Sequence, residues 1–228
     1  DVRPLLADSR RNIILLPGQL LEIKSTLLSG RLLRNMIVRQ SGQFPRLAEI
    51  ASRAEECAHV VAEISRCIDE RAEVLDSASA ALARIRVALR QAHERVLQRL
   101  QRLISSQESA GYLQEALITQ RNGRYVIPLK AEFKGRIPGL IHDQSGSGAT
   151  LFIEPLATVE LNNEWRELQL EEEREVRRIL AGLTELPHDV RADVARAARH
   201  ENRLARHGVN VFRGKSSEKS SRSAGPGR

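Results

Sequence analysis

The stretch HDQSGSGATLFIEP, from His142 to Pro155, contains the residue types of a catalytic or phosphate-binding loop. A nucleophile elbow has the form Gly-x-Ser-x-Gly, but the outer positions around Ser147 are serine and alanine. A dinucleotide fingerprint needs a third glycine and a following helix. In this sequence the position of the third glycine is a leucine, and the residues that follow are typical of a strand. His142 and Asp143 are adjacent on an expected strand, so their side chains would point to opposite faces and should not form a proton relay. We therefore interpret the stretch as a tight turn in which Gly146 and Gly148 supply positive φ angles.

Two other motifs with chemical potential are incomplete. Gly214-Lys215-Ser216 resembles the end of a Walker A loop, but the earlier glycine is misplaced by one residue and no helix follows. His200-Glu201 begins like a zinc-protease helix, but leucine stands where the second histidine is needed. The histidines and cysteines show no zinc-ligand spacing. We expect no catalytic residue, no metal site and no cofactor in this chain.

Basic side chains gather just upstream of His142. Between Arg121 and Arg136 there are five lysines and arginines against one acidic residue, Glu132. A compact basic hairpin could bind a phosphate backbone, although no aromatic residues are interleaved for base stacking. The predicted phosphate contacts are Arg124, Lys130, Lys134 and Arg136. A hairpin with ordinary surface lysines is the alternative.

The net charge of +7 also suggests a nucleic-acid partner. Residues 189–228 contain ten lysines and arginines against four acidic residues, so the first 188 residues carry a net charge of only about +1. The acidic run Glu171–Glu173 is followed by arginines three and four residues on, and we predict pairing along a solvated helix face.

Apolar residues in steps of three and four predict long helices. One such seam runs from Leu47 to Ile68 and a second from Leu82 to Leu103. The second helix would extend from Ser79 to Ala110, about 48 Å, and we expect the two seams to pack as an antiparallel pair. An earlier helix is predicted from Pro17 to Val38. The candidate N-caps of the second seam helix are Asp76, Ser77 and Ser79.

After Gly111 the sequence is rich in β-branched residues and turn formers. The predicted strands are Arg124–Ala131, Ile137–His142 and Thr150–Ile153. A helix follows, with Thr158 as candidate N-cap and apolar positions up to Leu183. We then expect a short Arg-rich helix over 189–207 and a disordered end. The expected fold class is mainly α, with long antiparallel helices and a small antiparallel β insert.

The two cysteines, Cys57 and Cys67, fall on the first seam helix, about 15 Å apart, which is too far for a disulfide. They are predicted core residues in a reducing compartment. No apolar run approaches the roughly 18 residues of a membrane span, and no signal peptide is visible. We expect a cytoplasmic protein without membrane contact. The first residue is Asp1, which indicates a fragment or a processed product.

Three motifs occur in the order and spacing of a known family: GRYVIPLKAE, then PGLIHDQSGSGATLFIEP, then VELNNE. CIDERAEVLDSASAALARIR and the initial DVRPLL are also similar to it. Over roughly Asp1 to Leu183 the chain resembles the bacterial MutS paralogues of the second subfamily ("MutS-two"). That family combines a MutS-like helical core, an ATPase and usually a C-terminal Smr nuclease domain.

The resemblance implies a division of the chain. Residues 1–120 would be core and lever helices, 121–157 a clamp-like β insert, and 158–186 a returning lever helix. Residues 187–228 leave the family pattern and would be a divergent, basic, partly disordered tail. A truncated or frameshifted gene would produce such an end.

The resemblance also implies partners and function. The family is associated with branched or duplex DNA, suppression of recombination, rescue of collided ribosomes, and homodimers. ATP and Mg²⁺ would belong to an ATPase domain that this sequence lacks, as it lacks the nuclease domain. We therefore expect a noncatalytic lever and clamp region with weak, nonspecific nucleic-acid contact. The alternative is a helical module for protein interaction and assembly.

Overall fold

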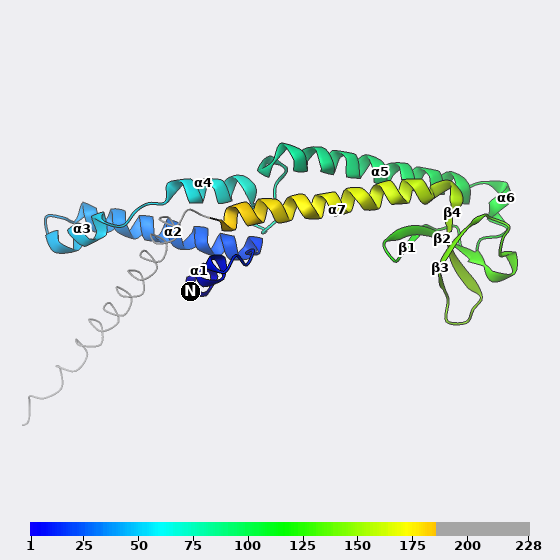
Figure 1. Ribbon diagram of the computed structural model, residues 1–228, viewed down its shortest axis with the longest axis horizontal. Helices are drawn as coiled ribbons and strands as arrows, with labels where there is room; N and C mark the ends of the chain where they lie inside the picture. Colours follow the sequence, from blue (N-terminus) through cyan, green and yellow to red (C-terminus); the bar gives the residue numbers. More distant parts are fainter. Residues whose placement is uncertain (186–228) are drawn as a thin grey trace, which may run out of the picture. The chain divides into compact units, whose positions relative to one another are not determined.

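The computed structural model describes residues 1–185. They form seven α-helices and four β-strands (Figure 1). The elements are α1 Arg3–Arg10, α2 Pro17–Arg39, α3 Pro45–Ser52, α4 Ala58–Cys67, α5 Ala80–Ile104, α6 Gln107–Ala110, β1 Thr119–Arg121, β2 Arg124–Lys130, β3 Gly139–Gln144, β4 Thr150–Pro155 and α7 Leu156–Thr184. The helix and the disordered end predicted beyond residue 188 lie outside the described residues.

The predicted fold class, mainly α with long antiparallel helices and a small β insert, was wrong. A four-stranded antiparallel sheet follows the first six helices, so the described chain is mixed α/β. The strand β1 was not predicted, because three residues, Thr-Gln-Arg, carry no apolar alternation. Its pairing depends on the turn at Asn122 and Gly123, whose φ angles of 53° and 72° suit a tight hairpin.

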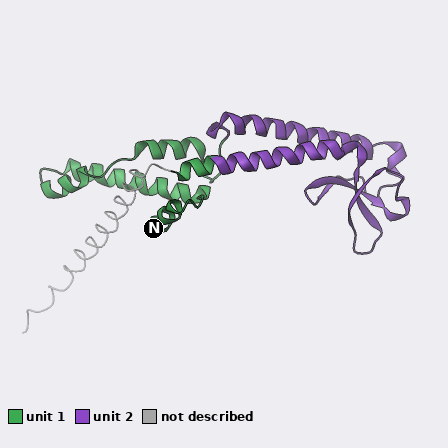
Figure 2. Ribbon diagram, in the orientation of Figure 1, with its two compact units in different colours: residues 1–75, 179–228 green, residues 76–178 purple. Residues whose placement is uncertain are grey.

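The described chain divides into two compact units, residues 1–75 with 179–185, and residues 76–178 (Figure 2). In the first unit, α2 packs against α3 and α4. The helix α2 begins at Pro17, as predicted, and buries Leu20, Ile23 and Leu27. The last turn of α7 joins this unit: Thr184 accepts a hydrogen bond from the Ser9 hydroxyl through its carbonyl (2.9 Å) and from the Leu15 N–H through its hydroxyl (3.1 Å).

The first apolar seam is not one helix. It is interrupted between Ser52 and Ala58, where Cys57 takes a left-handed conformation (φ 44°). The expected pairing of the two seams was also wrong, because α4 packs on α2, while α5 lies beside α7 in the second unit. Among the described residues neither cysteine forms a disulfide; both are buried, and burial raises the pKa of the Cys67 thiol.

In the second unit, α5 and α7 run antiparallel. Ser79 is the N-cap of α5 and accepts a hydrogen bond from the Leu82 N–H at 2.9 Å, as one of the candidates predicted. Three polar contacts join the two helices. They are Ser79–Glu175 (2.6 Å), Arg86–Glu172 (2.7 Å) and Arg95–Glu164 (2.6 Å). The helix ends at Ile104, earlier than predicted, and α6 follows.

The strand order in the sheet is β1-β2-β4-β3, and all neighbours are antiparallel. The three predicted strands are confirmed, with β3 starting two residues late because Pro138 has no N–H for the ladder. Ile127, Leu129 and Ile153 from the sheet share one buried cluster with Leu100 of α5 and Trp165 of α7. No helix among residues 1–185 is long and apolar enough to cross a membrane.

Candidate functional site

The turn over residues 145–149 joins β3 to β4 and confirms the prediction of a tight turn. The Gly148 N–H donates to the Ser145 carbonyl at 2.8 Å, and the Ser145 hydroxyl accepts from the Thr150 N–H at 3.0 Å. Only Gly148 of the two loop glycines has a positive φ (77°), so that part of the prediction was wrong for Gly146. The polar side chains of the loop therefore close a turn.

The sheet is curled, because its two edge strands meet. At the β1–β2 turn, the Asn122 side-chain amide donates to the His142 carbonyl of β3 at 3.2 Å. The neighbouring Arg121 pairs with Asp143 of β3 (3.0 Å), and its guanidinium lies over the Phe152 ring, 4.1 Å from the centroid. The bulge of β3 falls between Ile141 and Asp143, so His142 is the extra residue.

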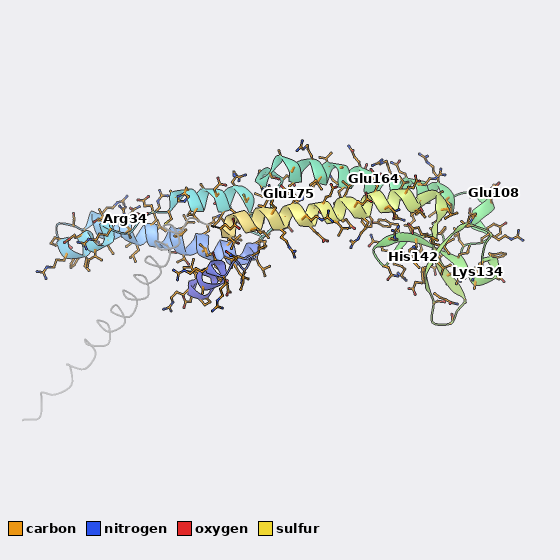
Figure 3. The ribbon with its side chains drawn as sticks, viewed as in Figure 1. Arg34, Glu108, Lys134, His142, Glu164 and Glu175 are labelled. Carbon is orange, nitrogen blue, oxygen red and sulfur yellow. The ribbon has the colours of Figure 1, made fainter. Side chains whose placement is uncertain are left out.

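The curl encloses the carboxylate of Glu154, which is fully buried. Three side chains donate to it. They are Arg124 (2.8 Å), His142 (2.6 Å) and Asn162 (2.8 Å). A buried carboxylate is tolerated only with such partners. We call Glu154, Arg124, His142 and Asn162 the Glu154 cluster; it includes residues from β2, β3, β4 and α7, and Figure 3 labels His142.

Asn162 also extends the sheet. Its side-chain amide donates to the Tyr125 carbonyl and accepts from the Tyr125 N–H, both at 3.1 Å, as a neighbouring strand would. Asn163 accepts from Arg124 at 2.6 Å. The Tyr125 hydroxyl forms a hydrogen bond with His93 Nε2 at 2.7 Å, and the Tyr125 ring packs on the Trp165 ring. The start of α7 is thereby fastened to β2 and α5.

Sequence reasoning did not identify the Glu154 cluster. Two signals could have indicated it: a glutamate inside the apolar run LFIEP, and the adjacent asparagines of VELNNE. The cluster offers no open position to a substrate, because the carboxylate has no exposed surface. Among residues 1–185 no group of three His, Cys, Asp or Glu side chains could hold a metal ion. The hydrogen bonds of the cluster hold β2, β3, β4 and the start of α7 together.

The four predicted phosphate contacts differ in their surroundings: two have internal hydrogen-bond partners and two are exposed without an ion pair to any described residue. The Arg124 guanidinium is held by Glu154 and Asn163. The Lys130 ammonium donates to the Gly111 carbonyl (3.2 Å) and lies 5.8 Å from the centre of the Phe133 ring. Lys134 and Arg136, on the connection between β2 and β3, are exposed, and within the described part of the chain neither has an ion-pair partner (Figure 3). These two remain the best-placed cations of the set.

The predicted pairing of the acidic run along its own helix was wrong for Glu172, which pairs with Arg86 of α5. The intrahelical pair that does form on this stretch is Glu175 with Arg178, at 2.7 Å. Hydrogen bonds from Arg178 and Ser79 lower the pKa of Glu175 to about 2. This carboxylate thus ties the start of α5 to α7.

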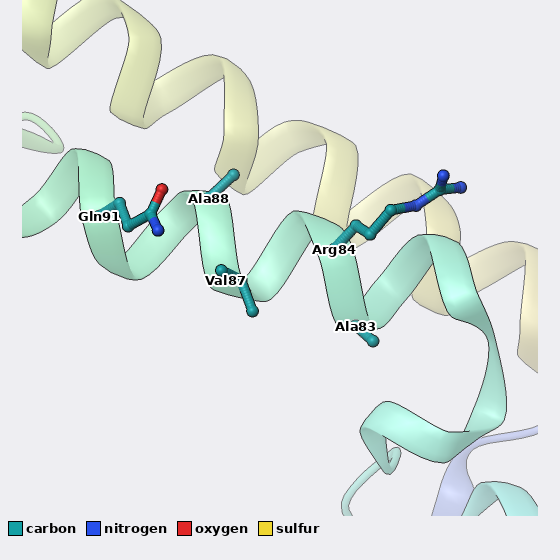
Figure 4. A pocket seen from close by; sticks show the side chains of 5 residues that line it. All are labelled: Ala83, Arg84, Val87, Ala88 and Gln91. Carbon is teal, nitrogen blue, oxygen red and sulfur yellow. The ribbon is translucent and has the colours of Figure 1, made fainter.

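A shallow, open depression of about 420 Å³ lies on α5 (Figure 4). It exists because alanines stand where larger side chains would fill the surface. The lining residues are Ala83, Arg84, Val87, Ala88 and Gln91. None of them is an acid, a histidine or a nucleophile.

Comparison with known proteins gives close relatives. The chain is 44% identical over 188 residues to "Endonuclease MutS2" of Thermomicrobium roseum, covering 81% of this chain and 24% of that protein. The proteins of the same name from Geobacillus sp. (44% over 189 residues, 82% and 24%) and Brevibacillus brevis (43% over 187 residues, 81% and 24%) are similar to the same extent. The chain thus spans about a quarter of the length of the curated relatives it matches. A scan against models of protein families finds no match.

Proposed function

The chain belongs to the MutS2 family and matches about a quarter of the length of its relatives. From this premise we propose that it supplies the lever and clamp region of a MutS-type DNA-binding protein. In this assignment the paired helices α5 and α7 form the lever, and the curled sheet is the clamp. The segment contacts duplex or branched DNA through phosphates, weakly and without sequence preference. ATP binding, nuclease activity, dimer formation, and any role in recombination or on ribosomes are assigned to the longer family proteins.

The exposure of Lys134 and Arg136 is the observation that supports this proposal most. Both residues lie on the connection between β2 and β3 and take part in no ion pair among the described residues. The Arg124 guanidinium, in contrast, is hydrogen-bonded to Glu154 and Asn163. Free cations bind phosphates without first losing an internal partner. The Glu154 cluster supports the proposal indirectly, because it holds the sheet to α7 and so fixes where these cations are presented.

The test is the salt dependence of binding to a duplex and to a four-way junction. The variant Lys134→Gln/Arg136→Gln should lower the slope of log K against log [salt] by about 1.8, or about 0.9 for each lost phosphate contact on B-DNA. A matched control is Arg39→Gln/Arg46→Gln, which removes two exposed charges from the first unit. Equal slopes for both variants would refute a specific role for the sheet.

A second candidate function is assembly through the helices of the first unit. Large apolar side chains are exposed on α2, on α3 and beside α3, as at a protein interface. They are Leu32 (67%), Met36 (63%), Phe44 (48%), Leu47 (42%) and Ile50 (44%). Sedimentation over a hundredfold range of concentration would show self-association under this hypothesis. A monomer at every concentration would count against it.

A further inference from the structure

The exposed surface of α5 is strongly and one-sidedly basic. Ten side chains between Arg84 and Arg102 are exposed, and they comprise five arginines, three glutamines, one glutamate and one valine. The exposed part of α7 in the same unit is balanced, with four arginines and four glutamates. The near neutrality of the first 188 residues therefore hides a local excess of basic side chains on α5.

Most of these arginines have no internal partner. Arg95 pairs with Glu164, and the inward-facing Arg86 pairs with Asp76 and Glu172. In residues 1–185, the remaining exposed arginines of α5 take part in no ion pair; they are Arg84, Arg90, Arg99 and Arg102. Arg99 and Arg102, three positions apart, repel one another, and an anionic partner would stabilise this surface.

The spacing of the arginines sets the shape of that partner. Of the arginines without an ion pair among the described residues, Arg84, Arg99 and Arg102 are separated by 15 and 3 positions, which places them within about 60° of one another around the α-helix, whereas Arg90 lies about 120° from Arg84 and Arg102. From Arg84 to Arg102 the helix rises about 27 Å, the length of about eight base-pair steps. The partner is thus an extended polyanion and not a single small anion.

We infer that this face of α5, which we call the arginine face, binds the phosphate backbone of a nucleic acid. This inference deepens the proposed function and rests on it. Guanidinium groups bind phosphate oxygens with two hydrogen bonds each, and the interleaved glutamines are further donors. An acidic protein surface is the less suitable partner, because protein interfaces have an apolar centre and this face exposes only one apolar side chain, Val87.

The test compares two variants of the whole chain with the same loss of charge. Arg84→Gln/Arg99→Gln/Arg102→Gln changes the arginine face, and Arg166→Gln/Arg174→Gln/Arg177→Gln changes exposed arginines of α7. The probe is a 30-base-pair duplex, with poly-L-glutamate as a second polyanion. Circular dichroism confirms that both variants keep their helix content.

We expect the α5 variant to lower the slope of log K against log [salt] for the duplex by about 2.7, and the α7 variant by less than one. Equal slopes for the two variants would overturn the inference, because net charge alone would then explain binding. It would also be overturned if the α5 variant lost poly-L-glutamate binding and kept duplex binding, which would indicate a protein partner.

The two proposals fail in different ways. If the α5 variant binds the duplex as the unaltered chain does, while Lys134→Gln/Arg136→Gln lowers the slope, the arginine face is excluded and the role of the sheet stands. If neither variant changes the slope, both proposals are excluded.

Discussion

Glu154 determines the roles of its neighbours. Its carboxylate has no contact with solvent, and its two oxygens accept from Arg124, His142 and Asn162. Arg124 was a predicted phosphate contact because basic residues cluster around it in the sequence. The structure places its guanidinium between Glu154 and Asn163, which only the pairing of β2, β4 and α7 can reveal.

A double-mutant cycle tests this role of Arg124. Arg124→Met should lower the free energy of unfolding by about 2–3 kcal/mol, because it leaves the buried carboxylate with one cation fewer. Adding Glu154→Gln should cost less than the sum of the two single changes. Urea unfolding followed by the fluorescence of Trp165, the single tryptophan, reports on this unit. Unchanged stability together with a lower DNA salt slope would instead make Arg124 a phosphate contact.

The pKa of Glu175 predicts a pH dependence. It is lowered from 4.5 to about 2 by hydrogen bonds from Arg178 and Ser79. A depressed carboxylate pKa stabilises the fold above the unfolded-state value, and this contribution is lost as the pH falls from about 4.5 through about 2. Glu175→Gln should therefore lose less stability than the unaltered chain over this range, measured by urea unfolding at each pH. Parallel losses in the two proteins would contradict the assignment.

The pairing of β3 with β4 depends on a glycine. A Cβ atom at Gly139 would lie 2.6 Å from the Glu154 carbonyl oxygen and 3.2 Å from the Pro155 Cα. The strands can approach only because this side chain is absent. Since Glu154 lies on β4, the approach also places its carboxylate within reach of His142.

Gly139→Ala should destabilise the second unit by about 1–3 kcal/mol, because the clash is with backbone that cannot turn away. Gly146→Ala is the matched control: nothing lies within 4 Å of its Cβ position and its φ is not positive. The measurement is the urea midpoint of Trp165 fluorescence. Equal midpoints for the two variants would contradict this prediction, because β3 and β4 could then move apart without a loss of stability.

The elements set by local chemistry were predicted. Pro17 begins α2, Ser79 caps α5, and β-branched residues bounded by turn formers predict β2 and β4. The features that failed depend on contacts between distant residues. The apolar seam from Leu47 to Ile68 continues across a break at Cys57, so its pattern alone could not show that the helix stops. Likewise, α5 carries the same apolar pattern whether its partner is α4 or α7.

At the scale of the whole molecule, composition alone was misleading about charge. The excess of lysine and arginine beyond residue 188 left a net charge of only about +1 for the first 188 residues, which gave no indication of a basic surface on α5. The structure places four unpaired arginines on the exposed side of α5 and two free cations beyond β2. A net charge near zero over the first 188 residues is therefore compatible with a local basic surface, because the balancing acids lie elsewhere in the sequence.

On the proposed function, residues 1–185 contact nucleic acid by themselves. The most direct measurement is a salt titration of duplex and four-way-junction binding by the whole chain and by a chain ending at residue 188. We predict that the shorter chain still binds and retains a salt slope of at least about 3, from the arginine face and the exposed cations of the sheet. Loss of binding with residues 189–228 would contradict the account and assign the nucleic-acid contact to the basic C-terminal residues.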